Sequence, residues 1–101
     1  MEFKLKETGE SMLMEMSGKL TYADQNKAKE IESLVDNCKA KSVQFDLSGL
    51  SSVDSSGFGM LIRWKDAGLK HGVETKFLNP TGIVAKSLKA AHLDDYLSVD
   101  Q

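Results

Sequence analysis

The sequence predicts one α/β domain over residues 1–101, with helices packed on a mixed, mostly parallel sheet of about five strands. Apolar residues alternate with polar ones in short segments, and between those segments they recur at three- and four-residue steps. The resulting order is β-β-α-β-α-β-α-β. Strands that alternate with helices are joined by crossover connections, which make them parallel. A chain of 101 residues has room for one core of this kind.

The first two strands are expected to form a hairpin. Apolar and polar residues alternate over positions 3–5 and again over 12–16, and the segment Thr8-Gly9-Glu10 between them is typical of a turn. Ser17-Gly18 is expected to end the second strand.

A first helix is expected over Tyr22–Lys39. Its apolar residues form one stripe: Ala28, Ile31, Leu34, Val35 and Cys38. Cys38 is therefore expected to be a small buried residue. Thr21 is the predicted N-cap, with Asp24 in the favourable first turn.

The remaining elements alternate between the two periods. We expect strands over Ser42–Leu47, ended by Ser48-Gly49, and over Glu74–Leu78, with a helix over Ser56–Lys70 between them. Asn79-Pro80 is a turn signal. A third helix and a short last strand follow; their apolar residues are Ile83, Val84, Leu88 and Ala91, and then Tyr96, Leu97 and Val99.

The second helix carries two apolar arcs. One is expected to face the core and contains Phe58, Leu61, Ile62 and Leu69. The other contains Met60, Trp64 and Ala67, whereas a surface helix needs only one apolar stripe. The second arc either packs under a neighbouring segment or forms a partner-binding patch, since Trp and Met are favoured in interface cores. Solvent exposure of Trp64 would decide between the two.

The turn Asp54-Ser55-Ser56-Gly57 is the candidate functional site. It follows a strand and opens a helix, at the carboxyl end of the predicted sheet, where α/β proteins bind their ligands. Backbone N–H groups and the helix dipole stabilise an anion at this place. A serine here is therefore a favourable phosphate acceptor, and a phosphate adds about −1.5 to −2 charges. The alternative is that Asp54, Ser55 or Ser56 is only an N-cap. Gly59 is expected to let another backbone approach closely.

Composition narrows the possible functions. The net charge of −2 and the scattered lysines argue against a nucleic-acid partner and against a polybasic membrane patch. No apolar run is long enough for membrane insertion, and the first residues lack the apolar region of a secretory signal. The single cysteine, Cys38, excludes an internal disulfide and a cysteine-rich metal site. These features predict a cytoplasmic protein.

The sequence does not predict an enzyme, a cofactor or a metal site. The two histidines, His71 and His92, both follow predicted helix ends, where a cation caps the helix more often than it catalyses. The Gly-x-Ser-x-Gly, P-loop and dinucleotide-binding patterns are all missing around the glycine-rich turn. Asp46 lacks the acidic pair that a phosphoaspartate receiver needs, and Asp94-Asp95 is expected to be an exposed loop pair.

The stretch from Val43 to Leu61, VQFDLSGLSSVDSSGFGML, resembles the STAS domain of anti-sigma factor antagonists. In that family a strand and a short loop lead into Asp-Ser-[Ser/Thr]-Gly-[Leu/Phe]-Gly. The upstream segment Ser17-Gly18-Lys19-Leu20-Thr21 is similar to the family's Gly-x-Leu-[Asp/Thr] segment, and Asn79-Pro80 matches in place. The resemblance covers nearly the entire chain.

The resemblance implies a partner-switching regulator. The unphosphorylated domain would bind a serine kinase of the histidine-kinase-like ATPase type that is also an anti-sigma factor, and so free the sigma factor. Phosphorylation of Ser55, or of Ser56 as second choice, would end binding, and a PP2C-type phosphatase would restore it. The motif and partner-binding residues are then Asp54, Ser55, Ser56, Gly57, Phe58, Gly59, Met60 and Trp64.

Two alternatives within the same fold remain. A STAS regulator can control a non-sigma output, such as biofilm formation or motility, through the same kinase and phosphatase logic. A small cytoplasmic STAS subunit of a lipid-transport ABC ATPase can be equally short, but its motif tends to lose the central serine. The intact Ser55-Ser56 pair favours a phosphorylated regulator over a transporter subunit.

Overall fold

The computed structural model describes residues 1–100. The elements follow the predicted order, with one short 3-10 helix (η1) added before the first α-helix. Their bounds are β1 Glu2–Thr8, β2 Ser11–Leu20, η1 Tyr22–Asp24, α1 Gln25–Asp36, β3 Ser42–Val53, α2 Ser55–Lys70, β4 Glu74–Leu78, α3 Gly82–Ala90 and β5 Val99–Asp100. Within residues 1–100, none of the helices has the length and apolar character needed to cross a membrane.

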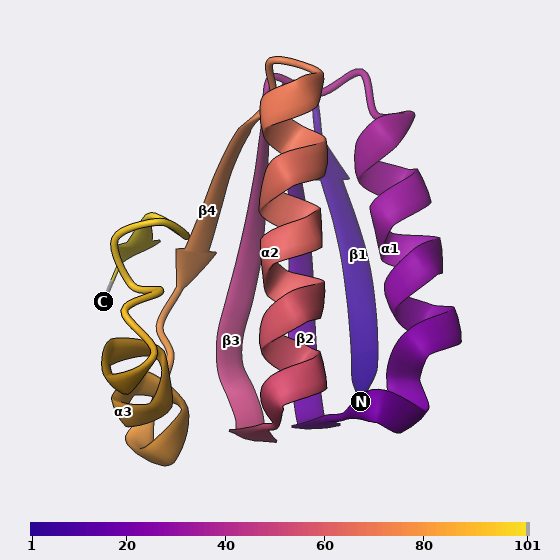
Figure 1. Ribbon diagram of the computed structural model, residues 1–101. Coiled ribbons are helices and arrows are strands. Elements are labelled where there is room, and N and C mark those ends of the chain that lie inside the picture. The colour runs from indigo at the N-terminus through magenta and orange to yellow at the C-terminus, as the bar shows by residue number, and fades with distance from the viewer. Residues whose placement is uncertain (101) are drawn as a thin grey trace.

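The sheet is mixed and mostly parallel, as predicted. Its five strands lie in the order β1-β2-β3-β4-β5; β1 is antiparallel to β2, and each later pair is parallel. Figure 1 shows α1 and α2 side by side in front of the sheet, with α3 near the carboxyl end of β4. The strands β2 and β3 therefore end together, beside the first turn of α2.

The core lies between the sheet and the helices. Phe45 of β3 is its centre, because its ring stacks on Trp64 of α2 at 5.3 Å and on Phe77 of β4 at 4.9 Å between centroids. All three rings are essentially inaccessible to solvent. This stacking fixes α2 against the middle of the sheet and so fixes the position of the turn that begins it.

Two predicted strand ends are wrong, because bulges continue the strands where glycine was expected to break them. The register of β2 and β3 shifts between Glu15 and Ser17 and again between Gly18 and Lys19. A Cβ on Gly49 would lie only 2.5 Å from the Met16 carbonyl oxygen, so the glycine at this bulge allows a close backbone approach. Both strands thereby reach the turn that precedes α2.

The ends of the first helix and of the chain also differ from the prediction. Thr21 caps as expected, but it caps η1, with Asp24 completing a capping box, and α1 ends at Asp36. Cys38 therefore lies beyond the helix and is half-buried. The last strand is limited to Val99–Asp100, while Tyr96 belongs to a turn before it.

Two large apolar residues expected in the core are exposed, and so is Ala91, which is the C-cap of α3. Leu69 is 59% exposed and Ile83 is 63% exposed. Their neighbours Gly68 and Val84 are buried, so Leu69 and Ile83 lie on the solvent side of their helices.

Candidate functional site

Asp54 joins the start of α2 to the end of β2. Its backbone is extended, and its carboxylate Oδ1 accepts a hydrogen bond from the Gly57 N–H at 2.8 Å, which makes it the N-cap. Oδ2 accepts a second bond, from the Tyr22 N–H at 3.3 Å. The Asp54 N–H donates to the Leu20 carbonyl at 3.1 Å. Asp54 therefore fills the capping role predicted for this motif, and neither serine is needed as the N-cap.

Gly57 is the point of closest packing in the turn. A Cβ built on it would lie 2.6 Å from Val53 Cγ1 and 2.7 Å from the Leu20 carbonyl oxygen. Such distances are too short for any side chain, so the first turn of α2 lies directly on the ends of β2 and β3. Gly59 was expected to serve a close approach as well, but no atom lies within 4 Å of a Cβ placed there. That expectation is wrong for the isolated chain.

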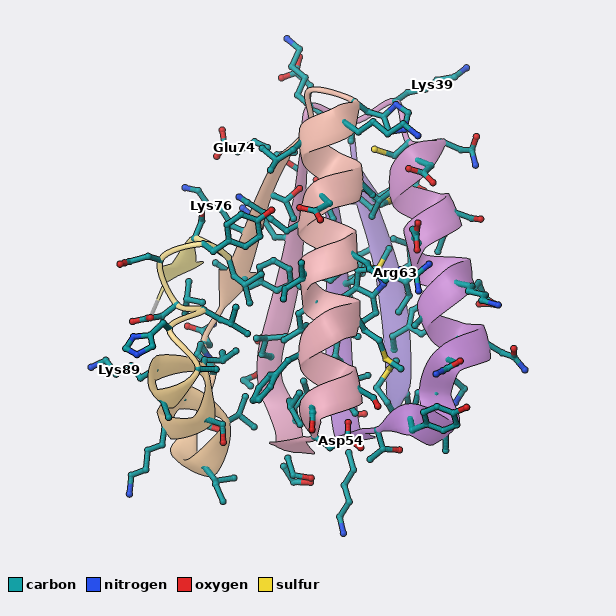
Figure 2. The ribbon with its side chains drawn as sticks, in the orientation of Figure 1. Lys39, Asp54, Arg63, Glu74, Lys76 and Lys89 are labelled. Carbon is teal, nitrogen blue, oxygen red and sulfur yellow. The ribbon has the colours of Figure 1, made fainter. Side chains whose placement is uncertain are left out.

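The two serines differ in accessibility. Ser55, the first residue of α2, is exposed, whereas Ser56 is half-buried. The Gly57 N–H is already bonded to Asp54, so an anion on Ser55 would be stabilised by the helix dipole and by the N–H groups that precede Gly57. The geometry gives Ser55 the better access to an incoming enzyme. Figure 2 shows Asp54 at this end of α2.

Met60 and Trp64 do not form an exposed patch, which was one of the two alternatives for this arc. Trp64 is 1% exposed and Met60 is 6% exposed. The indole N–H of Trp64 donates to the Ala28 carbonyl of α1 at 3.0 Å, so this arc of α2 packs under α1. Of the two alternatives that the sequence leaves open, packing under a neighbouring segment is therefore the correct one, and Trp64 is a core residue.

A groove remains between α1 and α2 above this buried arc. Its volume is about 200 Å³, and Ala28, Met60 and Trp64 contribute apolar atoms to its lining. The other lining residues are Tyr22, Gln25, Lys29, Glu32, Ser56, Gly59 and Arg63. Figure 2 shows Arg63 between the two helices, and its Nε lies 3.4 Å from Glu32 Oε1. The groove therefore includes Ser56, a residue of the motif.

The segment before α1 is held by a buried carboxylate. Asp24 Oδ1 lies 3.0 Å from the Met1 ammonium, and Oδ2 accepts the Thr21 N–H at 2.9 Å. Burial alone would raise the pKa of Asp24, but the hydrogen bond from Thr21 and the charge of the ammonium outweigh it and lower the pKa below its ordinary value. This cluster fixes η1, whose Tyr22 N–H in turn binds Asp54.

Sequence reasoning did not identify Tyr22 as part of the site. The hydrogen bond between Tyr22 and Asp54 depends on the end of β2 lying beside the end of β3, and no local sequence pattern predicts that neighbourhood. Its one sequence signal is the spacing Thr21 to Asp24, a capping box that fixes where the helical turn begins.

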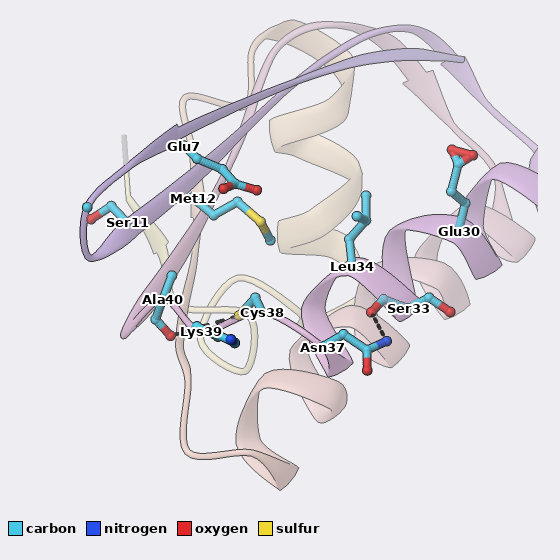
Figure 3. Close-up of a pocket in the computed structure, with 11 residues that line it drawn as sticks. Glu7, Ser11, Met12, Glu30, Ser33, Leu34, Asn37, Cys38, Lys39 and Ala40 are labelled. Atoms are coloured by element: carbon cyan, nitrogen blue, oxygen red, sulfur yellow. Dashed lines mark hydrogen bonds between the residues drawn. The ribbon is translucent and has the colours of Figure 1, made fainter.

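A second cavity, of about 470 Å³, lies at the opposite end of the molecule (Figure 3). It is formed by the hairpin connecting β1 to β2 and by the end of α1, and Met12, Leu34 and Cys38 line it together with polar residues. The Cys38 thiol donates to the Ala40 carbonyl at 3.8 Å. His71 also lies away from the motif, as the C-cap of α2, with Nε2 3.1 Å from Asp36 Oδ1. None of the predicted site residues lines this cavity.

Comparison with solved structures gives similar folds. The chain superposes on the anti-sigma factor antagonist SpoIIAA in its unphosphorylated form with a TM-score of 0.81 and 20% identity, covering 99% of this chain and 89% of that chain. For the phosphorylated form of Bacillus SpoIIAA the TM-score is 0.73, with 20% identity and coverages of 99% and 92%.

Two further similar structures come from other organisms. An anti-sigma factor antagonist from Mycobacterium paratuberculosis gives a TM-score of 0.83 at 14% identity, covering 97% of this chain and 83% of that chain. A sulfate transporter family protein from Wolinella succinogenes gives 0.73 at 13% identity, with coverages of 86% and 70%. At such identities these likenesses show a shared fold. No curated protein sequence matches the chain.

The family model of the STAS domain matches residues 2–101, which is nearly the whole chain. The motif Asp54-Ser55-Ser56-Gly57 and the strand that precedes it carry the same resemblance in the sequence, and the observed sheet and helices agree with it. The chain therefore belongs to the STAS domain family.

Proposed function

We propose that this protein is a phosphorylation-controlled partner-switching regulator of the anti-sigma factor antagonist type, without catalytic activity of its own. Unphosphorylated, it binds a serine kinase of the histidine-kinase-like ATPase type that also acts as an anti-sigma factor. Phosphorylation of Ser55 ends binding, and a PP2C-type phosphatase restores it. The observation that carries the proposal is an exposed serine at the first position of α2, with the capping role already filled by Asp54.

The rigidity of the turn supports a switch based on charge. Asp54 is bonded to the Leu20 carbonyl, the Tyr22 N–H and the Gly57 N–H, so a group added to exposed Ser55 need not displace the cap. A phosphate places about −1.5 to −2 charges there, comparable to the net charge of −2 of the whole chain. Repulsion and desolvation at a binding face then suffice to lose a partner.

The first experiment locates the phosphate. The protein is incubated with ATP and the serine kinase encoded nearest its gene, and intact mass and peptide mapping follow. We expect one phosphate on Ser55; Ser56→Ala should accept it and Ser55→Ala should not. A phosphate mapped to Ser56 would change the residue and keep the mechanism. No phosphorylation, together with co-purification of an ATPase and a permease, would favour a transporter subunit.

The second experiment measures binding to the same kinase by calorimetry. Ser55→Ala should bind as the unphosphorylated protein does, and Ser55→Asp should bind at least tenfold more weakly, a loss of about 1.4 kcal/mol. Ser55→Asp should unfold at the same temperature or slightly higher, because a carboxylate in the first turn of a helix is stabilising by about 0.3–1 kcal/mol. If both variants bind as the wild type does, the switch is refuted.

A further inference from the structure

Gly59 has no role in the fold that the structure reveals. It is not among the glycines with positive φ, and no atom lies within 4 Å of a Cβ built on it. A glycine in a helix interior destabilises by about 0.5–1 kcal/mol relative to alanine. In the same helix, Gly57 and Gly68 each have atoms too close for a side chain. Gly59 alone among these three costs stability without serving packing or backbone conformation.

The space that Gly59 leaves open belongs to the groove between α1 and α2. The volume of about 200 Å³ is below the ~300–1,000 Å³ typical of small-molecule sites, so the groove suits one side chain better than a whole ligand. Among its lining residues, Met60 and Trp64 are buried and apolar, whereas Tyr22 is 68% exposed. An apolar side chain entering here would cover exposed apolar surface without disturbing the core.

The charges around the groove indicate which residues should flank that side chain in the partner. Lys29 and Arg63 supply two cations against one anion, Glu32, in a chain whose net charge is −2. Arg63 Nε lies 3.4 Å from Glu32 Oε1, and the Arg63 side chain remains 63% exposed. The guanidinium has five N–H donors, so it can also bind a second carboxylate. Lys29 makes no ion pair within residues 1–100. The groove is locally positive and complements an acidic segment.

We infer that this groove binds the kinase partner through an apolar side chain followed by acidic residues, and that Gly59 keeps it open. The inference rests on the proposed function and names the surface that the switch controls. Ser55 lies four residues before Gly59, so both are on the same side of α2. A phosphate on Ser55 would stand beside the entrance of the groove and repel an acidic segment.

The first test uses peptides. The probe is the blocked peptide acetyl-Leu-Glu-Glu-amide, and the control is acetyl-Leu-Lys-Lys-amide, both at millimolar concentration. Trp64, the single tryptophan, reports binding by fluorescence, and NMR chemical shifts of backbone amides locate it. We expect the acidic peptide to shift the amides of Gly59 and Arg63, and to bind at least tenfold more tightly than the basic one, about 1.4 kcal/mol.

The variants separate groove binding from folding. Gly59→Ala should narrow the groove, raise the thermal stability and weaken peptide binding several-fold, and Lys29→Glu should likewise weaken binding of the acidic peptide several-fold. The proposal is overturned if the acidic peptide does not bind the wild type, if Gly59→Ala binds it equally well, or if the shifts lie elsewhere. If the peptide binds but Ser55 is never phosphorylated, the groove stands and the partner is not a kinase. If Gly59→Ala binds the kinase as the wild type does, the groove fails and the switch stands.

Discussion

Replacing Gly57 with alanine tests whether the motif glycine is required by packing. Alanine is the better helix former, by about 0.5–1 kcal/mol, so helix propensity alone predicts a more stable protein. The structure instead predicts that Gly57→Ala lowers the free energy of unfolding. The new Cβ would lie 2.6 Å from Val53 Cγ1 and 2.7 Å from the Leu20 carbonyl oxygen, and the second of these is a backbone atom that cannot rotate away.

The magnitude follows from the two opposing contributions. Forcing a methyl group into a packed region costs about 1–3 kcal/mol. After the gain in helix propensity is subtracted, Gly57→Ala should lower the free energy of unfolding by about 0.5–2 kcal/mol. The matched control is Gly59→Ala, which lies in the same helix two residues later and has open space around its Cβ. It should raise the free energy of unfolding by about 0.5–1 kcal/mol.

Urea unfolding and thermal unfolding, both followed by far-ultraviolet circular dichroism, measure both variants. A difference of 1 kcal/mol moves the melting temperature by about 4–8 °C in a domain of this size, so opposite signs are easily resolved. The reasoning is refuted if both variants are stabilised, because the contact of Gly57 with Leu20 would then not limit the site. It is equally refuted if both are destabilised, since Gly59 would then have an unseen role in folding.

Two further changes test the elements that hold the site. Trp64→Phe should lower the free energy of unfolding by about 1–3 kcal/mol in urea titrations, because it removes the hydrogen bond to Ala28 and leaves a cavity; unchanged stability with lost kinase binding would instead make Trp64 a contact residue. Asp24→Asn should cost about 1–2 kcal/mol at neutral pH. Because the pKa of Asp24 is lowered by folding, its contribution is complete above the ordinary value of about 3.9 and is lost as the pH falls through the lowered pKa. Wild type and variant should therefore converge in acid, and a pH-independent difference would contradict this.

The period of the apolar residues was sufficient to predict the order of the elements and the place of the motif. It could not predict that β2 and β3 continue past their glycines. A bulge depends on the partner strand, and here the close approach of Gly49 to the Met16 carbonyl exists only once the two strands are paired. The same pairing brings the Tyr22 N–H to Asp54, so the second anchor of the site was equally beyond local reasoning.

The two apolar arcs of α2 show where helical periodicity is ambiguous. One arc faces the sheet with Leu61. The other contains Met60 and Trp64, and Trp64 both stacks on Phe45 of the sheet and donates a hydrogen bond to α1. A helix that packs on a sheet and also against a neighbouring helix on the same face needs both arcs buried. The sequence contains the two arcs but not the position of α1, so an interface patch and a second packing face look alike until the helices are placed.

Under the proposed function, the position of Asp54 makes a change of charge, rather than refolding, the suitable signal at this turn. One carboxylate caps α2 and also holds the Tyr22 N–H before α1, so the two helices that border the groove share an anchor. At Gly57 the same turn packs closely against Leu20, which leaves little room for a conformational change. Exposed Ser55 lies outside these contacts. Under the proposed function, a phosphate there would change the potential at the mouth of the groove while the anchors stay in place, and its free energy would therefore be expressed in the affinity for the partner rather than in the stability of the fold.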